Sequence, residues 1–171
     1  MILEILKYPH PSLKAKAEKV RALDDEVIRL IDDMVETLYA SPGVGLAAPQ
    51  VGHSLRVIAI DVSRNSGNSN RRAKDPGHGL MILINPAILY QEGEKMVREG
   101  CLSLPEYTAN VKRARRVVVN GLDRNWNPVE LTSKDFEAVA LQHEIDHLEG
   151  ILFIERVGSL KTDLFRRKDM D

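Results

Sequence analysis

The stretch Gln142-His143-Glu144-Ile145-Asp146-His147 contains the residue types best suited to chemistry. It follows the pattern H-E-x-x-H, which in a helix places His143 and His147 one turn apart on the same face, within reach of one metal ion. Glu144 lies beside the first histidine and can take a proton from a metal-bound water without being a ligand itself. The same pattern arises by chance in core helices, so its meaning depends on a third ligand elsewhere in the chain.

The residues around this motif predict a buried helix. Thr132 or Ser133 is expected to cap its start, and Gly150 is expected to end it. Asp135 and Glu137 place negative charge in the first turn, where the helix dipole favours it. Apolar side chains cover most of the circumference, as expected of a helix buried on nearly all sides: Phe136, Ala138, Val139, Ala140, Leu141, Ile145 and Leu148.

Three sources of a third ligand can be compared. The longer zinc-hydrolase pattern ends in a further histidine, but Phe153 occupies that position. Glu155 follows His147 too closely to return on a second helix. Cys101, the only cysteine, remains, although a free cysteine is commonly just a small buried apolar residue. Two histidines, one thiolate and an open fourth position predict a catalytic rather than a structural site. Asp146 is expected at the helix surface or beside the ligands.

Composition limits the class of protein. The chain has 171 residues, which predicts one domain spanning 1–171. Its net charge of −1 argues against a general nucleic-acid binder. No apolar run resembles a signal peptide or a membrane span. A single cysteine excludes a disulfide within the chain and fits a reducing cytoplasm.

The remaining elements must position these residues. Residues 25–40 predict a packing helix, capped by Asp24 or Asp25, with one apolar stripe: Val27, Leu30, Ile31, Met34 and Leu38. Strands are expected at 55–62, at 80–85 (ended by Pro86), around 88–90 and 111, and at 117–119 and 129–131. Residues 63–79 predict a mobile exposed loop, in which His78 is solvated. The expected fold is α+β, with antiparallel strands around the central metal-motif helix and the 25–40 helix outside.

Two further motifs surround glycines that allow close backbone approach to a ligand: Gly43-Val44-Gly45-Leu46-Ala47-Ala48-Pro49-Gln50 and Glu99-Gly100-Cys101-Leu102-Ser103-Leu104. Each is weak alone, and the first is equally consistent with a tight turn entering a strand. In this order with the H-E-x-x-H helix, over essentially the whole chain, they resemble bacterial peptide deformylases. The 63–79 loop is an apparent insertion away from all three motifs.

The resemblance implies a metal-dependent hydrolase that removes the formyl group from the N-terminal formylmethionine of newly made proteins and releases formate. Carried over by motif, Cys101, His143 and His147 hold the metal, and Glu144 is general base and then general acid. Gln50 and the backbone N–H of Leu102 are implied to bind the oxyanion. The family's metal is ferrous iron, for which zinc, nickel or cobalt can substitute.

The substrate contacts are hypotheses drawn from the same motifs. Gly45 and Gly100 would let an extended formylmethionyl nascent polypeptide pair with the backbone, and Val44 and Val139 would line a pocket for the methionine side chain. Glu99 and Arg113 either form a buried pair that holds the Cys101 segment or are both solvated. The cluster of Lys112, Arg113, Arg115 and Arg116 is expected to form a mainly solvated face.

Two other functions remain open from the sequence. A metalloprotease would share the helix but cleave unformylated internal peptide bonds. A non-enzymatic, metal-stabilised binding module, using its basic clusters on RNA, would unfold on chelation and tolerate loss of Glu144. For the deformylase, transient ribosome contact through Arg166, Arg167 and Lys168 is a further hypothesis, and neither a membrane nor a disulfide partner is expected.

Overall fold

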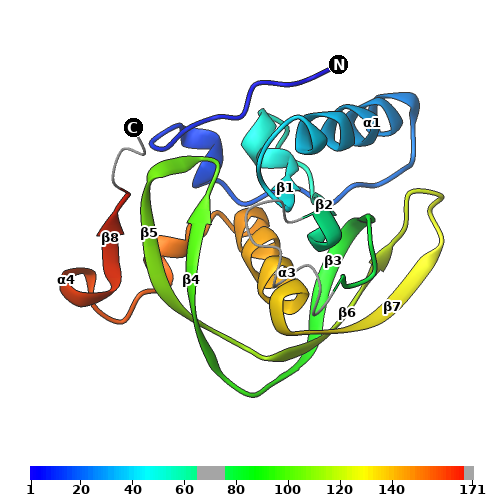
Figure 1. Cartoon of the computed structure of the whole chain (residues 1–171). Coiled ribbons are helices and arrows are strands. Elements are labelled where there is room, and N and C mark those ends of the chain that lie inside the picture. Colours follow the sequence, from blue (N-terminus) through cyan, green and yellow to red (C-terminus); the bar gives the residue numbers. More distant parts are fainter. Residues whose placement is uncertain (65–75, 168–171) are drawn as a thin grey trace.

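The computed structural model describes residues 1–64 and 76–167 (Figure 1). Its helices are α1 (Asp25–Tyr39), α3 (Asp135–Leu148) and α4 (Leu160–Asp163). Short 3-10 turns lie at Pro11–Leu13, Ala48–Val51, Val62–Arg64 and Phe153–Arg156. The strands are β1 (Gly45–Ala47), β2 (Val57–Ile60), β3 (Met81–Glu92), β4 (Lys95–Cys101), β5 (Leu104–Arg113), β6 (Arg116–Leu122), β7 (Pro128–Lys134) and β8 (Leu164–Arg166).

Five strands form one antiparallel sheet in the order β1-β2-β3-β6-β7. Strand β2 is buried on both faces, and its alternating side chains serve two different layers. Ile58 and Ile60 join the core that contains α3, whereas Val57 and Ala59 join the core that contains α1. This explains the uninterrupted apolar run of β2, because a strand covered on both faces has no solvated side.

A second antiparallel sheet has the order β4-β5-β8. Only Ala114 and Arg115 separate the end of β5 from the start of β6, so the chain passes directly from one sheet into the other. Figure 1 shows α3 enclosed between the two sheets, with α1 at the periphery. The expected α+β fold, with antiparallel strands around a central helix and an outer N-terminal helix, is therefore confirmed.

The outer helix α1 forms as its sequence predicts. The Asp24 carboxylate accepts a hydrogen bond from the Val27 N–H at 2.9 Å and caps the helix. All five residues of the expected apolar stripe are buried. No helix in the described ranges is long and apolar enough to cross a membrane.

The start of α3 differs from the expectation. Neither Thr132 nor Ser133 caps it: the N-cap residue is Lys134, which makes no side-chain capping bond, and the Ser133 hydroxyl donates to Glu137 at 2.7 Å instead. Asp135 enters the helix with a φ of 56°. At the other end, Gly150 adopts a left-handed φ of 74° just after the last turn, as predicted.

Strand β3 also differs, because it continues through Pro86 to Glu92 rather than ending there. Register shifts against β6 occur between Ile84 and Ala87, so the proline, which has no N–H to donate, lies in an irregular part of the ladder. Asn85 stands there with a φ of 52°, and its side chain bonds the N–H and C=O of Val20 at 2.8 and 2.9 Å.

The predicted 63–79 loop lies largely outside the described residues. Its last part is ordered by the start of α3: the His78 ring Nδ1 lies 2.5 Å from the Glu137 carboxylate, and the His78 N–H donates to the same group at 2.6 Å. Glu137 is buried. The expectation that His78 is merely solvated was wrong, because a buried carboxylate needs hydrogen-bond donors and His78 supplies two.

Candidate metal centre

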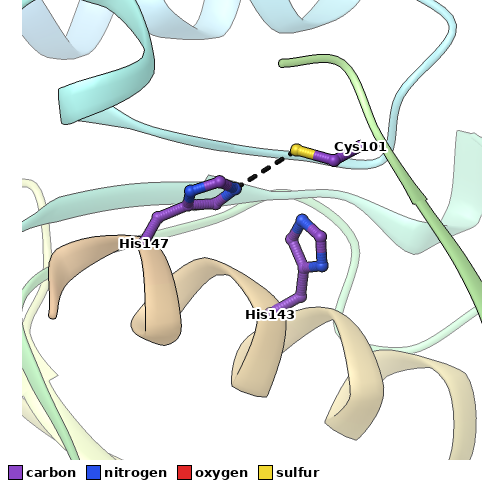
Figure 2. Close-up of side chains that lie close together, drawn as sticks. All are labelled: Cys101, His143 and His147. Atoms are coloured by element: carbon purple, nitrogen blue, oxygen red, sulfur yellow. Dashed lines mark hydrogen bonds between the residues drawn. The ribbon is translucent and has the colours of Figure 1, made fainter. Parts of the chain in front are cut away.

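Helix α3 and strand β4 bring three donor side chains together. His143 and His147 lie on one face of α3, with ring centroids 5.0 Å apart. Cys101 lies at the end of β4, and its sulfur is 3.3 Å from the Nε2 atom of His147 (Figure 2). One ligand atom from each of the three residues lies within 4.8 Å of the others. The sequence expectation that this cysteine approaches the two histidines therefore agrees with the geometry.

The chemistry of this group fits a transition-metal ion. A thiolate and two imidazoles are donors that suit zinc or iron, and three protein ligands leave a position open. Burial lowers the pKa of His143, but Glu144, Cys101 and Glu99 outweigh it and raise that pKa well above its usual value. These neighbours favour positive charge at His143, and a divalent ion would supply that charge in place of a proton.

Glu99 orients the first histidine. Its Oε1 atom accepts a hydrogen bond from His143 Nδ1 at 2.8 Å. Holding the proton on Nδ1 leaves the Nε2 lone pair of His143 free for a metal, the usual arrangement of a metal-binding histidine. Phe153, which occupies the place of a third histidine in the longer pattern, is fully buried and stacks on the His143 ring at a centroid distance of 6.2 Å. It therefore packs the ligand instead of adding one.

Glu144 follows His143 on α3 and is buried beside the cluster. Its Oε2 atom is 4.0 Å from His143 Nε2, and its Oε1 atom has no hydrogen-bond partner among residues 1–64 and 76–167. Burial raises the pKa of this carboxyl to about 7, against the lowering effect of His143. A carboxyl group with a pKa near neutrality can both accept and return a proton.

Gly45 on β1 packs directly against this carboxylate. A Cβ atom placed on Gly45 would lie 2.5 Å from Glu144 Oε2 and 2.9 Å from its Cγ. Since real side chains do not approach so closely, any residue larger than glycine would displace the Glu144 side chain. The second glycine of the Gly43–Gln50 motif is thus explained by its contact with the helix.

Gln50 presents its amide nitrogen to the same cluster. Its Oε1 atom accepts a hydrogen bond from the Ala47 N–H at 2.9 Å, which orients the amide. Its Nε2 atom donates to Ser103 Oγ at 3.1 Å and lies 3.6 Å from the Cys101 sulfur. Leu102 directly follows the cysteine and lines the same cavity. The structure therefore places both expected oxyanion-binding residues beside Cys101.

A pocket of about 770 Å³ opens from the metal cluster toward solvent. It lies between β1 and β4, each the outermost strand of its own sheet, and is bounded by α3. The four expected substrate-contacting residues all line it: Val44, Gly45, Gly100 and Val139. Outermost strands carry unpaired backbone groups, so the pocket has hydrogen-bonding edges on two sides.

An ion-pair network lies behind the cluster. Arg113 donates two hydrogen bonds to Glu99, at 2.6 and 2.9 Å, and a third to Asp146 at 2.7 Å. Burial favours the neutral acid, but Arg113 and His143 outweigh it and lower the pKa of Glu99 to about 2. Arg156 closes the network with two bonds to Asp146, at 2.7 and 3.1 Å.

This network decides between the alternatives that the sequence left open for the Glu99–Arg113 pair and for Asp146, and it removes Arg113 from the mainly solvated basic cluster. The Glu99–Arg113 pair is buried, so the alternative in which both are solvated was wrong. Arg113 therefore does not belong to a solvated basic face. Of the two positions expected for Asp146, the structure shows the one beside the ligands, because its side chain is buried. Its position three residues after His143 gave no signal of two arginine partners, because both come from other segments of the chain.

Arg64 is a residue that the sequence did not single out. Its guanidinium donates to four backbone carbonyls, those of Leu38, Tyr39, Ser41 and Gly43, at distances between 2.7 and 3.3 Å. It also lies 5.1 Å from the centroid of the Tyr39 ring. One side chain thus donates hydrogen bonds to the free carbonyl groups at the end of α1 and fixes the turn that leads to Val44 and Gly45 in the pocket wall.

Comparison with known proteins gives one consistent family. The family model for polypeptide deformylase matches residues 2–163. A peptide deformylase from Syntrophobacter fumaroxidans is 50% identical over 167 residues, covering 98% of this chain and 93% of the relative. A crystal structure of a peptide deformylase from Legionella pneumophila superimposes with a TM-score of 0.83 at 40% identity, covering 94% of this chain and 89% of that one.

A further solved relative contains a peptide. It is the class I type b peptide deformylase from Acinetobacter baumannii with Met-Ala-Ser bound. Its TM-score is 0.84 at 35% identity, and the match covers 92% of this chain and 99% of the other.

Proposed function

The chain belongs to the polypeptide deformylase family, and from this membership and the geometry of its metal cluster we propose how its own side chains perform the reaction. The enzyme is a metal-dependent hydrolase that removes the formyl group from the N-terminal formylmethionine of newly synthesised polypeptides and releases formate. The observation that carries the assignment of roles is the convergence of Cys101, His143 and His147 within 4.8 Å, beside the buried Glu144.

Cys101, His143 and His147 hold one divalent metal ion. Membership of the family implies ferrous iron as this ion, with zinc, nickel or cobalt as substitutes, and the mixed sulfur and nitrogen donor set is compatible with each of these metals. When bound, such an ion acidifies a coordinated water and polarises a carbonyl oxygen. Glu99 keeps His143 in the tautomer that leaves Nε2 free, and Arg113 keeps Glu99 ionised and fixed.

Glu144 moves the protons of the reaction. As general base it accepts a proton from the attacking water, and as general acid it delivers that proton to the amine that leaves the formyl carbon. Two features of the structure support this role. The Oε1 atom has no partner among the described residues, and burial brings the pKa of the carboxyl to about 7.

Gln50 and Leu102 stabilise the charge that develops on the formyl oxygen. The Gln50 Nε2 atom is held beside Cys101 by the Ala47–Gln50 hydrogen bond, so it needs no reorganisation during the reaction. The backbone N–H of Leu102 is the second donor. Removing one donor of this kind typically costs about 2.7–4 kcal/mol of transition-state stabilisation.

The nascent chain lies in the pocket between β1 and β4 as an extended strand. Gly45 and Gly100 expose backbone groups on the two edges, and Val44 and Val139 contact the methionine side chain. The Acinetobacter baumannii relative with Met-Ala-Ser bound supports the view that a short peptide occupies this fold. If Val44→Asp left the preference for methionine unchanged, the assignment of the side-chain pocket would be wrong.

Three broader assignments complete the proposal. The chain functions as one catalytic domain spanning 1–171, and it acts in the cytoplasm, where formylated chains are made. Arg166 and Arg167 are exposed on and after β8 and, with Lys168, provide a basic segment for transient contact with the ribosome. Lys168 lies outside the described residues.

The experiment is an assay of formate release from formyl-Met-Ala-Ser, using protein prepared without oxygen and supplied with ferrous iron or nickel. Oxygen is excluded because a thiolate together with ferrous iron is prone to oxidation. Release of formate with no cleavage of unformylated peptides supports the deformylase over a metalloprotease. A metal-loaded protein that releases no formate would contradict the proposal and leave a metal-stabilised binding module.

A further inference from the structure

Four cationic side chains lie in or beside the wall of the pocket, and we call them the rim: Lys95, Arg98, Lys134 and Arg167. Three of them line the pocket itself. The fourth, Arg167, covers Gly100, because a Cβ atom on that glycine would lie 2.6 Å from the Arg167 Nη2 atom. All four residues are exposed. The rim therefore carries positive charge where a peptide leaves the metal cluster.

No carboxylate in the described ranges neutralises this charge: none of the ion pairs there includes a rim residue. The partners of Arg98 are neutral, since its Nε donates to Asn110 Oδ1 at 3.0 Å and its guanidinium lies 3.7 Å from the Phe165 ring centroid. Three acidic residues line the pocket. Glu99 is neutralised by Arg113, and Glu144 lies at the metal cluster. Asp135 therefore contributes one negative charge to a pocket wall with four cations.

Because β4 is a strand, its rim cations lie on both of its faces. The pocket follows β4 from Cys101 to Lys95, and successive side chains of a strand point to opposite faces. Lys95 shares the face of the buried Glu99, whereas Arg98 is on the opposite face with Phe165. A peptide extended along this edge alternates in the same way, so an acidic side chain on either face meets a rim cation.

The positive charge of the rim can distinguish substrates by the side chains that follow their first residue. The formylated N-terminus is a neutral amide, so any charge in the first residues of the substrate comes from the side chains that follow the methionine. We propose that the rim selects nascent chains with aspartate or glutamate in the residues directly after the formylmethionine. This inference rests on the proposed deformylase function and specifies which of its substrates react fastest.

The test compares three peptides with amidated C-termini, which differ only in side-chain charge: formyl-Met-Asp-Asp-Ser amide, its asparagine counterpart formyl-Met-Asn-Asn-Ser amide, and formyl-Met-Lys-Lys-Ser amide. We expect kcat/KM to be on the order of tenfold higher for the aspartate than for the asparagine peptide at low salt, and lowest for the lysine peptide. The preference should shrink toward unity at about 0.5 M salt, because exposed charges are then screened over a few ångströms.

Variants assign the preference to the rim. Replacing all four rim residues by glutamine should bring the aspartate-to-asparagine ratio to within about twofold of unity, and Arg98→Glu alone should favour the lysine peptide. The matched control replaces four exposed cations that do not line the pocket and should keep the wild-type ratio: Lys19, Arg21, Arg29 and Lys161.

Two results would overturn the proposal. One is a wild-type enzyme that hydrolyses the aspartate and asparagine peptides equally at low salt. The other is a preference that survives in the rim variant. If the wild-type rates on the aspartate and asparagine peptides are equal and the rim variant binds ribosomes more weakly than Arg167→Gln alone, the rim is an RNA-contacting surface instead. The uncharged formyl-Met-Ala-Ser amide is measured alongside, because absence of formate from this neutral peptide would mean that the deformylase function itself had failed.

Discussion

Glu99 links a metal-binding histidine to a buried cation. One of its oxygens accepts from both His143 Nδ1 and Arg113, and the other accepts from Arg113 alone. The carboxylate is thus satisfied only when both partners are in place. Its low pKa shows that these partners outweigh the burial that alone would neutralise it.

We predict that Glu99→Gln weakens both stability and metal binding. Breaking a buried ion pair by removing one partner typically costs about 3–5 kcal/mol, because Arg113 is left with less compensation. Losing the partner that orients a ligand histidine typically reduces metal affinity about 10–100-fold. Urea unfolding and metal titration of the same preparation would measure the two effects.

Glu92→Gln is the matched control, because Glu92 pairs with Arg116 at 3.0 Å with both side chains more than two-fifths exposed. Such a surface pair contributes about 0–1 kcal/mol, so stability and metal affinity should hardly change. If Glu99→Gln and Glu92→Gln changed the free energy of unfolding and the metal affinity equally, burial of the Glu99–Arg113 pair would contribute to neither.

At the scale of elements, β1 and α3 meet at Gly45. Gly45→Ala should reduce kcat by about 100-fold, because the added methyl displaces the Glu144 carboxylate and misplacement of a catalytic group by about 1 Å has effects of that size. Metal content should be unchanged, since Glu144 is not assigned as a ligand. Steady-state kinetics and metal analysis would check both.

Gly158→Ala serves as the control, because its new Cβ would meet only Asp163 Oδ2, at 3.7 Å. It should leave kcat unchanged. If Gly45→Ala behaved in the same way, the tight contact between β1 and the general base would have no catalytic meaning.

The turn between α1 and β1 depends on one side chain. Arg64→Gln removes most of the hydrogen bonds to the 38–43 carbonyls and should loosen the wall that carries Val44 and Gly45. We expect KM for formyl-Met-Ala-Ser to rise on the order of tenfold, equivalent to about 1.4 kcal/mol, with a smaller change in kcat.

Arg64→Lys tests the same idea more narrowly, because a lysine keeps the charge but cannot reach several carbonyls in a fixed fork. The KM of Arg64→Lys should therefore rise as much as that of Arg64→Gln. If the KM of Arg64→Lys equalled that of the wild-type enzyme, the positive charge, and not the multiple hydrogen bonds, would hold the turn.

Local sequence patterns predicted the elements whose cause is local. The apolar stripe and Asp24 cap of α1, the Gly150 stop and the all-round burial of α3 were confirmed because each follows from side chains within a few residues. The continuation of β3 through Pro86 was missed, because pairing with β6 and the distant contact of Asn85 with Val20 override the local signal.

In the site, too, the sequence predicted what local chemistry requires and missed contacts between distant segments. Cys101 was identified because chemistry requires a third ligand and the chain offers one thiol. The carbonyl clamp of Arg64, the Arg156–Asp146 pair and the His78–Glu137 contact could not be predicted, since each joins segments whose proximity only the fold establishes.

At the scale of the whole molecule, the metal cluster joins the two sheets. Cys101 belongs to the β4-β5-β8 sheet, whereas α3 packs on the core of the five-stranded sheet. Large apolar cores on both sides of that sheet do not depend on the cluster. We therefore predict that chelation inactivates the enzyme without unfolding it.

The apo protein should have a Tm lower by about 5–10 °C, since a ligand at a hundred times its Kd stabilises by about 2.7 kcal/mol and a domain of this size shifts about 2–4 °C per kcal/mol. Differential scanning calorimetry before and after chelation would measure this shift. Complete unfolding at 25 °C would favour a metal-nucleated module. Return of activity with ferrous iron under argon would support the enzyme.

The central claim is that Glu144 moves the protons while Cys101, His143 and His147 hold the ion. The most direct measurement is therefore formate release by Glu144→Gln, with its metal content determined on the same sample. The account predicts a folded protein with one bound metal ion per chain and a kcat about 10²–10⁴-fold below the wild-type enzyme. A metal-loaded Glu144→Gln protein that releases formate at the wild-type rate would contradict it.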